Sequence, residues 1–333
     1  MTPREVIRMV FEGKKTPYVP WQFSFTHEAH QKLADHYGTH QLDPYLKPHF
    51  NSIDTWRLTD IGNDCVRDEF GVVWDHSQDK DIGVVKGCLL PEPSLRGFDF
   101  PDPLAHPLFR TIDADLAGAS DRCTMFDIGF SFYERAWTLR GIENLYMDFV
   151  ENPKFVHQLL GTIADHNIAM IREAVKHDID VVHMGDDWGG QHGLLMGPKH
   201  WYEFIYPQLK RMYAAIHAGG KFVSIHSCGD VDELLDDLVD IGLNCFNPFQ
   251  PEVMDVETLM PQYRGRLAFY GGLSTQRVLP YATPEGVRKA SRHLLNLGHA
   301  GGYIFAPAHS VEGDVPLENM LAAIETATSQ LGG

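Results

Sequence analysis

A histidine and a cysteine two positions apart, His226 and Cys228, come at the end of an apolar segment at 222–227. If this segment is a β-strand, residues two apart point to the same side, and an imidazole nitrogen and a thiolate can converge on one soft divalent metal ion. The spacing alone is weak evidence. A chain with 18 histidines and 5 cysteines contains such a pair by chance about a quarter of the time. Its place at the end of a predicted strand gives the pair weight.

A third candidate ligand, His309, follows the apolar segment 303–308. Three protein ligands would leave one coordination position open, as catalytic zinc sites do. The alternative is structural: His226 and His309 would be hydrogen-bonded polar residues at a rim, and Cys228 a small buried side chain. The residues by themselves leave both interpretations open.

Two adjacent acids, Asp186 and Asp187, end the segment 181–188 in a glycine-rich turn. Such carboxylates can orient a metal-bound group, accept a proton or bind a substrate through hydrogen bonds. Because neighbours on a strand face opposite sides, at most one of them faces a shared site, and we favour Asp187 as a catalytic residue. Both could equally be loop acids that contact only water and the loop backbone.

Two further strand ends carry polar or small residues. Gln250 could offer its amide to a substrate oxygen, and we take it as a second candidate catalytic residue. Gly271 and Gly272 would let the backbone approach a cofactor closely, and they are candidates for cofactor binding. Turns of this composition also occur without a function.

The elements that must position these residues alternate between short β-rich segments and longer helical ones, a pattern typical of parallel βαβ units. The candidate strands are 18–25, 52–58, 125–132, 181–188, 222–227, 245–250, 267–271 and 303–308. Eight parallel strands close a TIM barrel, in which reactive groups lie where the strands end. The sequence therefore predicts an α/β fold, a single (β/α)8 TIM barrel, with the candidate residues on one rim.

Helix signals agree with this alternation. Thr2, Pro3 and Glu5 form a predicted capping box for an N-terminal helix within 1–17, and Asn152 and Thr283 each precede a proline that begins a helix. Between Asp68 and Leu90 the pattern changes to two β-rich runs around a polar turn, which predicts an inserted hairpin near 68–90. With the Pro-rich stretch that follows, the insertion spans 68–107 of a single domain over 1–333.

Composition narrows the function classes. The 333 residues are 44% apolar and 22% charged, and the net charge of −17 disfavours nucleic acid and anionic membrane surfaces. No run of about eighteen apolar residues exists that would span a bilayer. An odd number of scattered cysteines, five, indicates reduced thiols. We expect a cytoplasmic protein, and its oligomeric state is unknown.

Taken together, several segments resemble the uroporphyrinogen decarboxylase superfamily, a TIM-barrel group, and within it the zinc-dependent, corrinoid-linked methyltransferases. The likeness covers most of the chain and is clearest after Gly129. In the family's order these segments are Ala136-Trp137-Thr138-Leu139, Asp186-Asp187-Trp188 with Trp201 and Phe204, His226-Ser227-Cys228-Gly229, and Pro316 with Asn319. The His-x-Cys-Gly element is typical of the methyltransferases.

The resemblance implies that His226 and Cys228 bind Zn²⁺ with a third ligand after the last strand. The family has a second cysteine there, and this chain has His309. It also implies a methyltransferase that passes a methyl group from a small methylated substrate to a corrinoid carried by a partner protein. The decarboxylases of the family bind a polycarboxylate through arginines near the N-terminus, and residues 16–55 contain no arginine.

Ligand charge refines this expectation. One thiolate and two imidazoles leave a net charge of +1 on Zn²⁺, whereas two thiolates neutralise it. A more electrophilic metal favours an oxygen leaving group, so we expect demethylation of a methoxylated compound. Two alternatives stay open: a metal-free decarboxylase or lyase with the same fold, and a non-catalytic binder of a metabolite or corrinoid.

Overall fold

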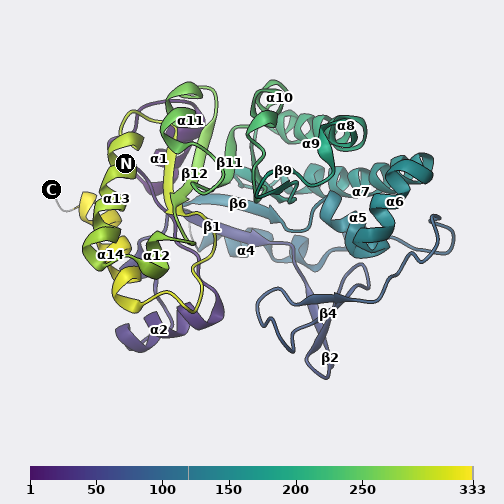
Figure 1. The fold of residues 1–333 in the computed structure, drawn as a ribbon, viewed down its shortest axis with the longest axis horizontal. Helices are drawn as coiled ribbons and strands as arrows, with labels where there is room; N and C mark the ends of the chain where they lie inside the picture. Colours follow the sequence, from purple (N-terminus) through teal and green to yellow (C-terminus); the bar gives the residue numbers. More distant parts are fainter. Residues whose placement is uncertain (119, 332–333) are drawn as a thin grey trace.

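The computed structural model describes residues 1–118 and 120–331. Its centre is a curled parallel sheet of seven strands in the order β1-β6-β7-β10-β11-β12-β13 (Figure 1). Their bounds are Phe50–Asp54, Cys123–Ile128, Val181–Gly185, Phe222–His226, Cys245–Phe249, Ala268–Leu273 and Tyr303–Pro307. The predicted α/β architecture of the TIM-barrel type is confirmed, and the C-terminal ends of these strands share one rim.

The eighth position of the barrel, between β13 and β1, is filled by an irregular segment at 20–26. Gln22 N donates to Phe305 O at 3.0 Å and Phe305 N to Pro20 O at 2.8 Å, so the segment pairs with β13 through its backbone. Toward β1 it uses a side chain, since Phe50 N donates to Gln22 Oε1 at 3.2 Å. Pro20 has no N–H to donate, which explains why the predicted strand over 18–25 is not regular.

Alternation along the strands divides the sheet into a face toward the helices and a face toward the barrel axis. The axial face is closed at its N-terminal end by a cluster that includes three residues of α1 (Pro3–Phe11). The cluster contains Ile7, Val10, Phe11, Phe50, Cys123, Met125, Val181, Cys245, Ala268 and Ile304. Side chains two or four positions farther along the same strands therefore line the axis near the rim.

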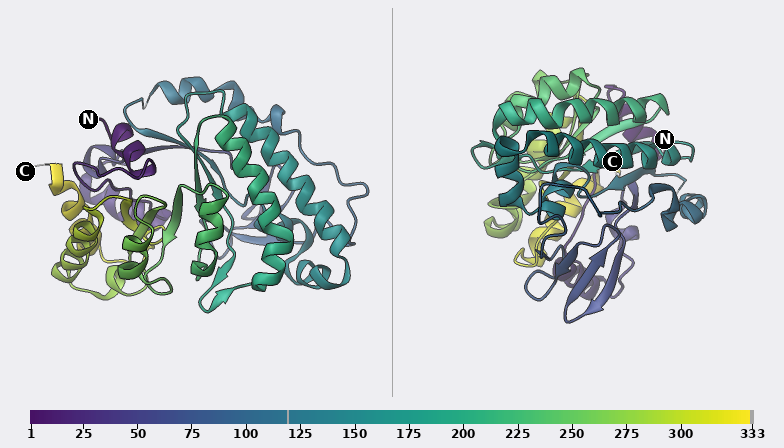
Figure 2. Two further views of the ribbon diagram at one scale, coloured as in Figure 1. Left: turned by 90° about the horizontal axis from the view of Figure 1, so that it is seen from above. Right: turned by 90° about the vertical axis from the view of Figure 1, so that its right-hand side faces the viewer.

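Helices cover the outer face of the sheet, and the long α7 and α9 lie side by side on one flank (Figure 2). The predicted caps of α1 and α13 are present, because Thr2 Oγ1 accepts from Glu5 N and Thr283 Oγ1 from Gly286 N. After α1 the helices are α2 His27–Tyr37, α3 Asp43–Leu46, α4 Ile112–Ala117, α5 Tyr133–Arg140, α6 Ile142–Glu151, α7 Pro153–Ala174, α8 Gly197–His200, α9 Tyr206–Ala218, α10 Leu235–Asp240, α11 Val256–Gln262, α12 Val278–Tyr281, α13 Pro284–Gly298 and α14 Leu317–Thr328. None of the helices in the described residues combines the length and apolar character that a membrane crossing needs.

The insertion projects from one side of the barrel as an antiparallel sheet (Figure 1). The predicted hairpin is present as β4 (Val73–Asp75) paired with β5 (Val84–Lys86). It is the second half of a four-stranded meander that begins earlier, with β2 (Leu58–Gly62) and β3 (Cys65–Asp68). The first half escaped prediction because all five residues of β2 are exposed, so the strand lacks a buried apolar face.

A buried ion pair joins this insertion to the barrel. Asp68 at the end of β3 accepts from Arg135 Nη1 of α5 at 2.5 Å, and both side chains are almost completely buried. The same carboxylate accepts from the backbone N–H groups of Phe70 and Val72. Both charges are partnered and hydrogen-bonded, so their burial is compensated, and the pair links the insertion to α5.

Candidate metal centre

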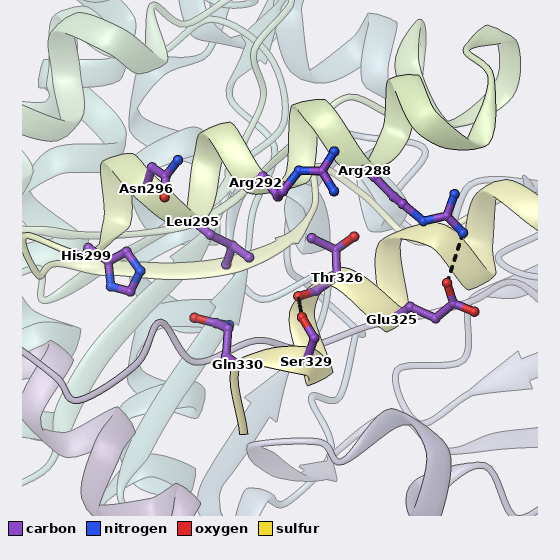
Figure 3. A pocket seen from close by; sticks show the side chains of 9 residues that line it. All are labelled: Arg288, Arg292, Leu295, Asn296, His299, Glu325, Thr326, Ser329 and Gln330. Carbon is purple, nitrogen blue, oxygen red and sulfur yellow. Dashed lines mark hydrogen bonds and ion pairs between the residues drawn. The ribbon is translucent and has the colours of Figure 1, made fainter. Parts of the chain in front are cut away.

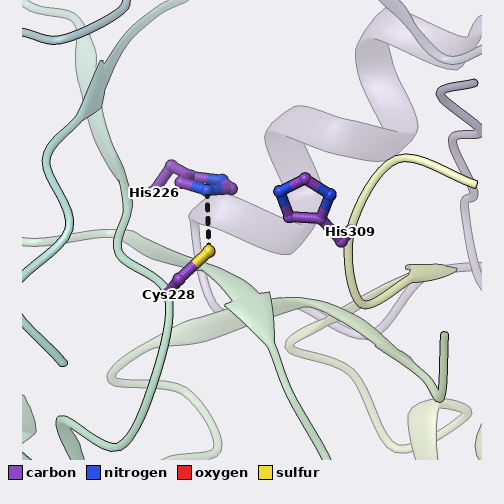
Figure 4. Close-up of side chains that lie close together, drawn as sticks. All are labelled: His226, Cys228 and His309. Carbon is purple, nitrogen blue, oxygen red and sulfur yellow. Dashed lines mark hydrogen bonds between the residues drawn. The ribbon is translucent and has the colours of Figure 1, made fainter. Parts of the chain in front are cut away.

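The side chains of His226, Cys228 and His309 converge at the barrel rim (Figure 4). Each offers one ligand atom, and these three atoms all lie within 4.8 Å of one another. Cys228 Sγ and His226 Nε2 are 3.3 Å apart, which matches the roughly 3.3–3.8 Å between ligand atoms of a tetrahedral zinc site. Within the described residues, this is the group of histidine, cysteine and acidic side chains that could hold a metal ion.

The orientation of His226 is set by a hydrogen-bond chain across two strands. Nδ1 of His226 lies 2.7 Å from Asn247 Oδ1 on β11. The amide group of Asn247 is oriented in turn, because its Nδ2 donates to Tyr270 O of β12 at 3.0 Å. An oxygen facing Nδ1 requires the proton there, so the lone pair is on Nε2, where it faces Cys228 Sγ at 3.3 Å and could bind a metal ion.

Asn247 is therefore expected to act as a positioning residue for the metal ligand His226. Replacing it with alanine should weaken zinc binding by about 10- to 100-fold, the usual cost of losing such a hydrogen bond to a ligating histidine. Asn247→Asp keeps an oxygen acceptor for His226 but loses the donation to Tyr270 O, so it should recover only part of that loss. Competition with a chelating dye measures both affinities, and an alanine variant that binds zinc as tightly as the native chain would contradict this role.

Cys228 lies in a tight turn that packs on the loop after β7. A Cβ at Gly229, whose φ is +84°, would lie 2.3 Å from the carbonyl carbon of Gly189, so glycine is required there. Burial and the nearby carboxylates of Asp187 and Glu134 raise the pKa of the Cys228 thiol. A cation at this position would reverse that effect, so the pocket suits a thiolate only together with a bound metal ion.

The donor set fits zinc. The pKa of His309 is lowered mainly by its withdrawal from water and secondly by the charge of His226. A lower pKa favours the neutral imidazole, which is the form that binds metals. One thiolate and two neutral imidazoles are ligands that zinc accepts.

The structure separates the two adjacent acids. Asp187 Oδ1 accepts from Cys228 N at 2.8 Å and lies 3.8 Å from His226 Nε2, so Asp187 belongs to the candidate site. Asp186 is fully buried, accepts from Glu134 N at the start of α5, and has its pKa raised to about 7 by burial. Sequence reasoning missed Glu134, whose buried carboxyl has a raised pKa caused by burial and by Asp187 and Asp186. No spacing signal connects residue 134 with residues 186 and 187.

Of the three other predicted site residues, Gln250 lines the cavity beside the candidate metal centre, and Gly271 and Gly272 do not. Gln250 is 8% exposed, just after β11, and lines a cavity of about 340 Å³ that also borders Cys228 and His309. Gly271 and Gly272 do not belong to the described lining of that cavity. Their missing side chains are explained by packing, since a Cβ would lie 2.6 Å from Phe249 N at Gly271 and 2.6 Å from Tyr303 Oη at Gly272.

Sequence reasoning also missed a pair of carboxylates beside the metal centre. Asp54 and Asp127 are register partners on β1 and β6. Asp127 continues the axial face of Cys123 and Met125, so it faces the interior of the barrel mouth. Burial and then Asp54 raise its pKa to about 7. Several axial positions near the rim are therefore polar, including His226 and Asn247.

A second cavity, of about 390 Å³, lies away from the rim between α13 and α14 (Figure 3). Its two arginines are already engaged, Arg288 with Glu325 and Arg292 with Glu285. These exposed ion pairs are typical of a solvated helix surface. We therefore take the rim cavity as the candidate site.

Comparison with known proteins identifies the family of this fold. Residues 136–330, more than half of the chain, match the family model described as "Uroporphyrinogen decarboxylase (URO-D)". The chain is 25% identical over 178 residues to the uroporphyrinogen decarboxylase of Methylococcus capsulatus, with 53% of this chain and 49% of that protein covered. It is 28% identical over 188 residues to that of Rhodococcus erythropolis, with 54% and 49% covered. The aligned part thus spans about half the length of these curated relatives.

A solved structure extends the likeness to the whole fold. The chain is similar to a methyltransferase from Methanosarcina mazei over 99% of both chains, with a TM-score of 0.78 and 16% sequence identity. At this identity the similarity concerns the fold alone. It includes the N-terminal part of the chain, which the family model does not cover.

Proposed function

The chain belongs to the uroporphyrinogen decarboxylase family, and we propose that it is a zinc-dependent methyltransferase of that family. In this proposal it moves a methyl group from a small methoxylated compound to the corrinoid of a partner protein. The observation that carries the proposal is the convergence of His226, Cys228 and His309 on one point at the rim. The similarity of the whole fold to a methyltransferase from Methanosarcina mazei supports it.

The alternative activity of the family, decarboxylation of a polycarboxylate, is less compatible with this chain. A substrate with several carboxylates needs cationic partners, and arginine is the usual one. The segment 16–55, which includes the irregular eighth position of the barrel, contains no arginine. The carboxyl groups of Asp54 and Asp127 also face the axis, where they offer such a substrate no cationic partner.

Each residue of the site has a defined task in this proposal. His226 and Cys228 would hold the metal from the end of β10, with Asn247 setting the histidine tautomer. A bound zinc ion supplies Lewis acidity that stabilises the oxygen from which the methyl group departs. Gln250 borders the cavity and can donate its amide hydrogens to the same substrate. In the proposed transfer the C–O bond of the methyl ether would break with its electron pair staying on oxygen, and the reduced corrinoid of the partner protein would supply the pair for the new bond to the methyl carbon.

The proposal is tested by metal analysis and by a methyl-transfer assay. We expect about one zinc per chain after dialysis, and transfer of methyl from methoxylated compounds to free reduced cobalamin, followed by its absorbance. Zinc-bound protein that methylates thiols but uses no methyl ether would overturn the choice of substrate. Zinc-free protein that decarboxylates a substrate, or binds a corrinoid without turnover, would replace the proposal with one of the two alternatives.

A further inference from the structure

The described lining of the rim cavity is polar but contains no lysine or arginine. The cavity is bordered by Cys228 and His309 and has a volume of about 340 Å³. This volume suits a small organic molecule. Besides Cys228 and His309, the polar side chains of the lining are three amides, two hydroxyls and one carboxylate, from Gln191, Gln250, Gln276, Thr275, Ser310 and Glu312.

Acidic side chains gather around Glu312 in the lining of the cavity. Glu312 lies three residues after His309 on the same loop, and its carboxylate is close to other acids. Partial burial and then Asp81, Asp314, Asp79 and Glu28 raise the pKa of Glu312. An anionic group beside Glu312 would lose water and meet like charge, and none of the described lining residues is a lysine or arginine that would compensate for it. The one positive centre would be the proposed zinc ion, which the ether oxygen of the methyl donor would occupy.

Amides and hydroxyls suit a different ligand. Each can both donate and accept, so together they can pair with the hydroxyl and ether oxygens of an uncharged molecule. Glu312 can accept a hydrogen bond only from a donor group such as a hydroxyl. Cys228 and His309 border the cavity, so the methyl-bearing oxygen would lie beside them and the hydroxyl groups nearer Glu312.

We infer that the methyl donor is an uncharged, hydroxyl-bearing methyl ether, and that carboxylate, sulfonate and phosphate compounds are rejected by the cavity. That the bound molecule donates a methyl group rests on the proposed function. That it is uncharged and bears hydroxyl groups rests on the cavity alone.

Two compounds that differ in one carboxylate test the inference: 2-methoxyphenol, which is neutral at pH 7, and 4-hydroxy-3-methoxybenzoate, which is an anion. Calorimetry with the intact zinc-loaded protein at low salt should show about three- to tenfold tighter binding of the neutral compound, as expected for like charges across a wet cavity. Methyl transfer to reduced cobalamin, measured with the same pair, should follow the same preference.

Two variants at exposed positions identify the source of the preference. Glu312→Gln should reduce the ratio of the two affinities by about threefold, and Gln276→Arg should reverse the preference by giving the benzoate a guanidinium partner. Glu143→Gln on α6 makes the same change of net charge outside the cavity and should leave the ratio unaltered.

The outcomes separate this inference from the proposed function. Tighter binding of the benzoate to the native protein, or binding of neither compound, would overturn the inference. Selective binding of the neutral compound without methyl transfer would support the inference and overturn the proposed function. Methyl transfer that prefers the benzoate would support the proposed function and overturn the inference.

Discussion

Replacing Cys228 with serine is expected to remove zinc binding and methyl transfer together. The thiolate is the only anionic ligand in the described group of three, so its loss leaves two neutral imidazoles and a weakly acidic hydroxyl. The expected cost in zinc affinity is more than about 100-fold, above the usual cost of disturbing a ligand indirectly. Metal content after dialysis and the rate of transfer to reduced cobalamin measure the two losses.

A second serine variant separates this effect from a general effect of removing a thiol. Cys88 is exposed, lies in the insertion and has Sγ within 3.1 Å of Arg140 O, outside the candidate metal centre. Cys88→Ser should keep one zinc per chain and full activity. Since Cys228 is only partly buried and serine is nearly isosteric, the thermal midpoint of Cys228→Ser should match that of the metal-free native chain. A Cys228→Ser protein that retains stoichiometric zinc would exclude this residue from the metal site.

The convergence of the three candidate ligands was predictable because it depends on topology. Parallel strands place their C-terminal ends on one rim, so His226 and His309, at the ends of different strands, come together even though 82 positions separate them. The sequence indicates this much as soon as the strands are recognised. Whether a metal is bound there stays a prediction.

Register, by contrast, could not be predicted from the sequence. Asn247 faces His226 because β10 and β11 pair with these two residues as register partners. A shift of one residue would turn the amide away from the axis. Asp54 and Asp127 are neighbours for the same reason, and nothing in their own segments of sequence indicates the pairing. The site residues that escaped prediction are therefore those defined by contacts between strands.

The irregular eighth position shows a second limit. The apolar alternation of residues 18–25 correctly indicated a place in the barrel wall, but not the backbone geometry. Gln22 replaces a backbone ladder with its side-chain oxygen, which accepts from both His49 N and Phe50 N. The periodicity of apolar residues indicates which side chains are buried but not which groups form hydrogen bonds. It therefore cannot predict that a side-chain oxygen accepts the hydrogen bonds that a strand backbone would accept.

Replacing Asp127 with asparagine is expected to stabilise the protein at pH 8 and to change little near pH 4.5. The carboxyl has a pKa of about 7 in the folded chain, against a value of 3.8 for an unperturbed aspartate, because burial and Asp54 disfavour its charge. The folded state therefore keeps a proton that the unfolded chain releases. The free energy of unfolding contributed by this group is fully present below about pH 4, falls as the pH rises toward 7, and stays low above it.

A difference of about three between the pKa of the folded and the unfolded chain corresponds to about 4 kcal/mol in the free energy of unfolding. Asp127 keeps partial contact with water at the barrel mouth, so we expect a gain of about 2 kcal/mol for Asp127→Asn at pH 8. Thermal unfolding of the variant and the native chain from pH 4.5 to 8 measures it, and Asp240→Asn, at an exposed position of α10, is the matched control. A difference in midpoint that is independent of pH would show that the stabilisation does not arise from the carboxyl proton. A difference that grows between pH 5 and 7 would measure how much stability the fold gives up to keep an acid on the barrel axis.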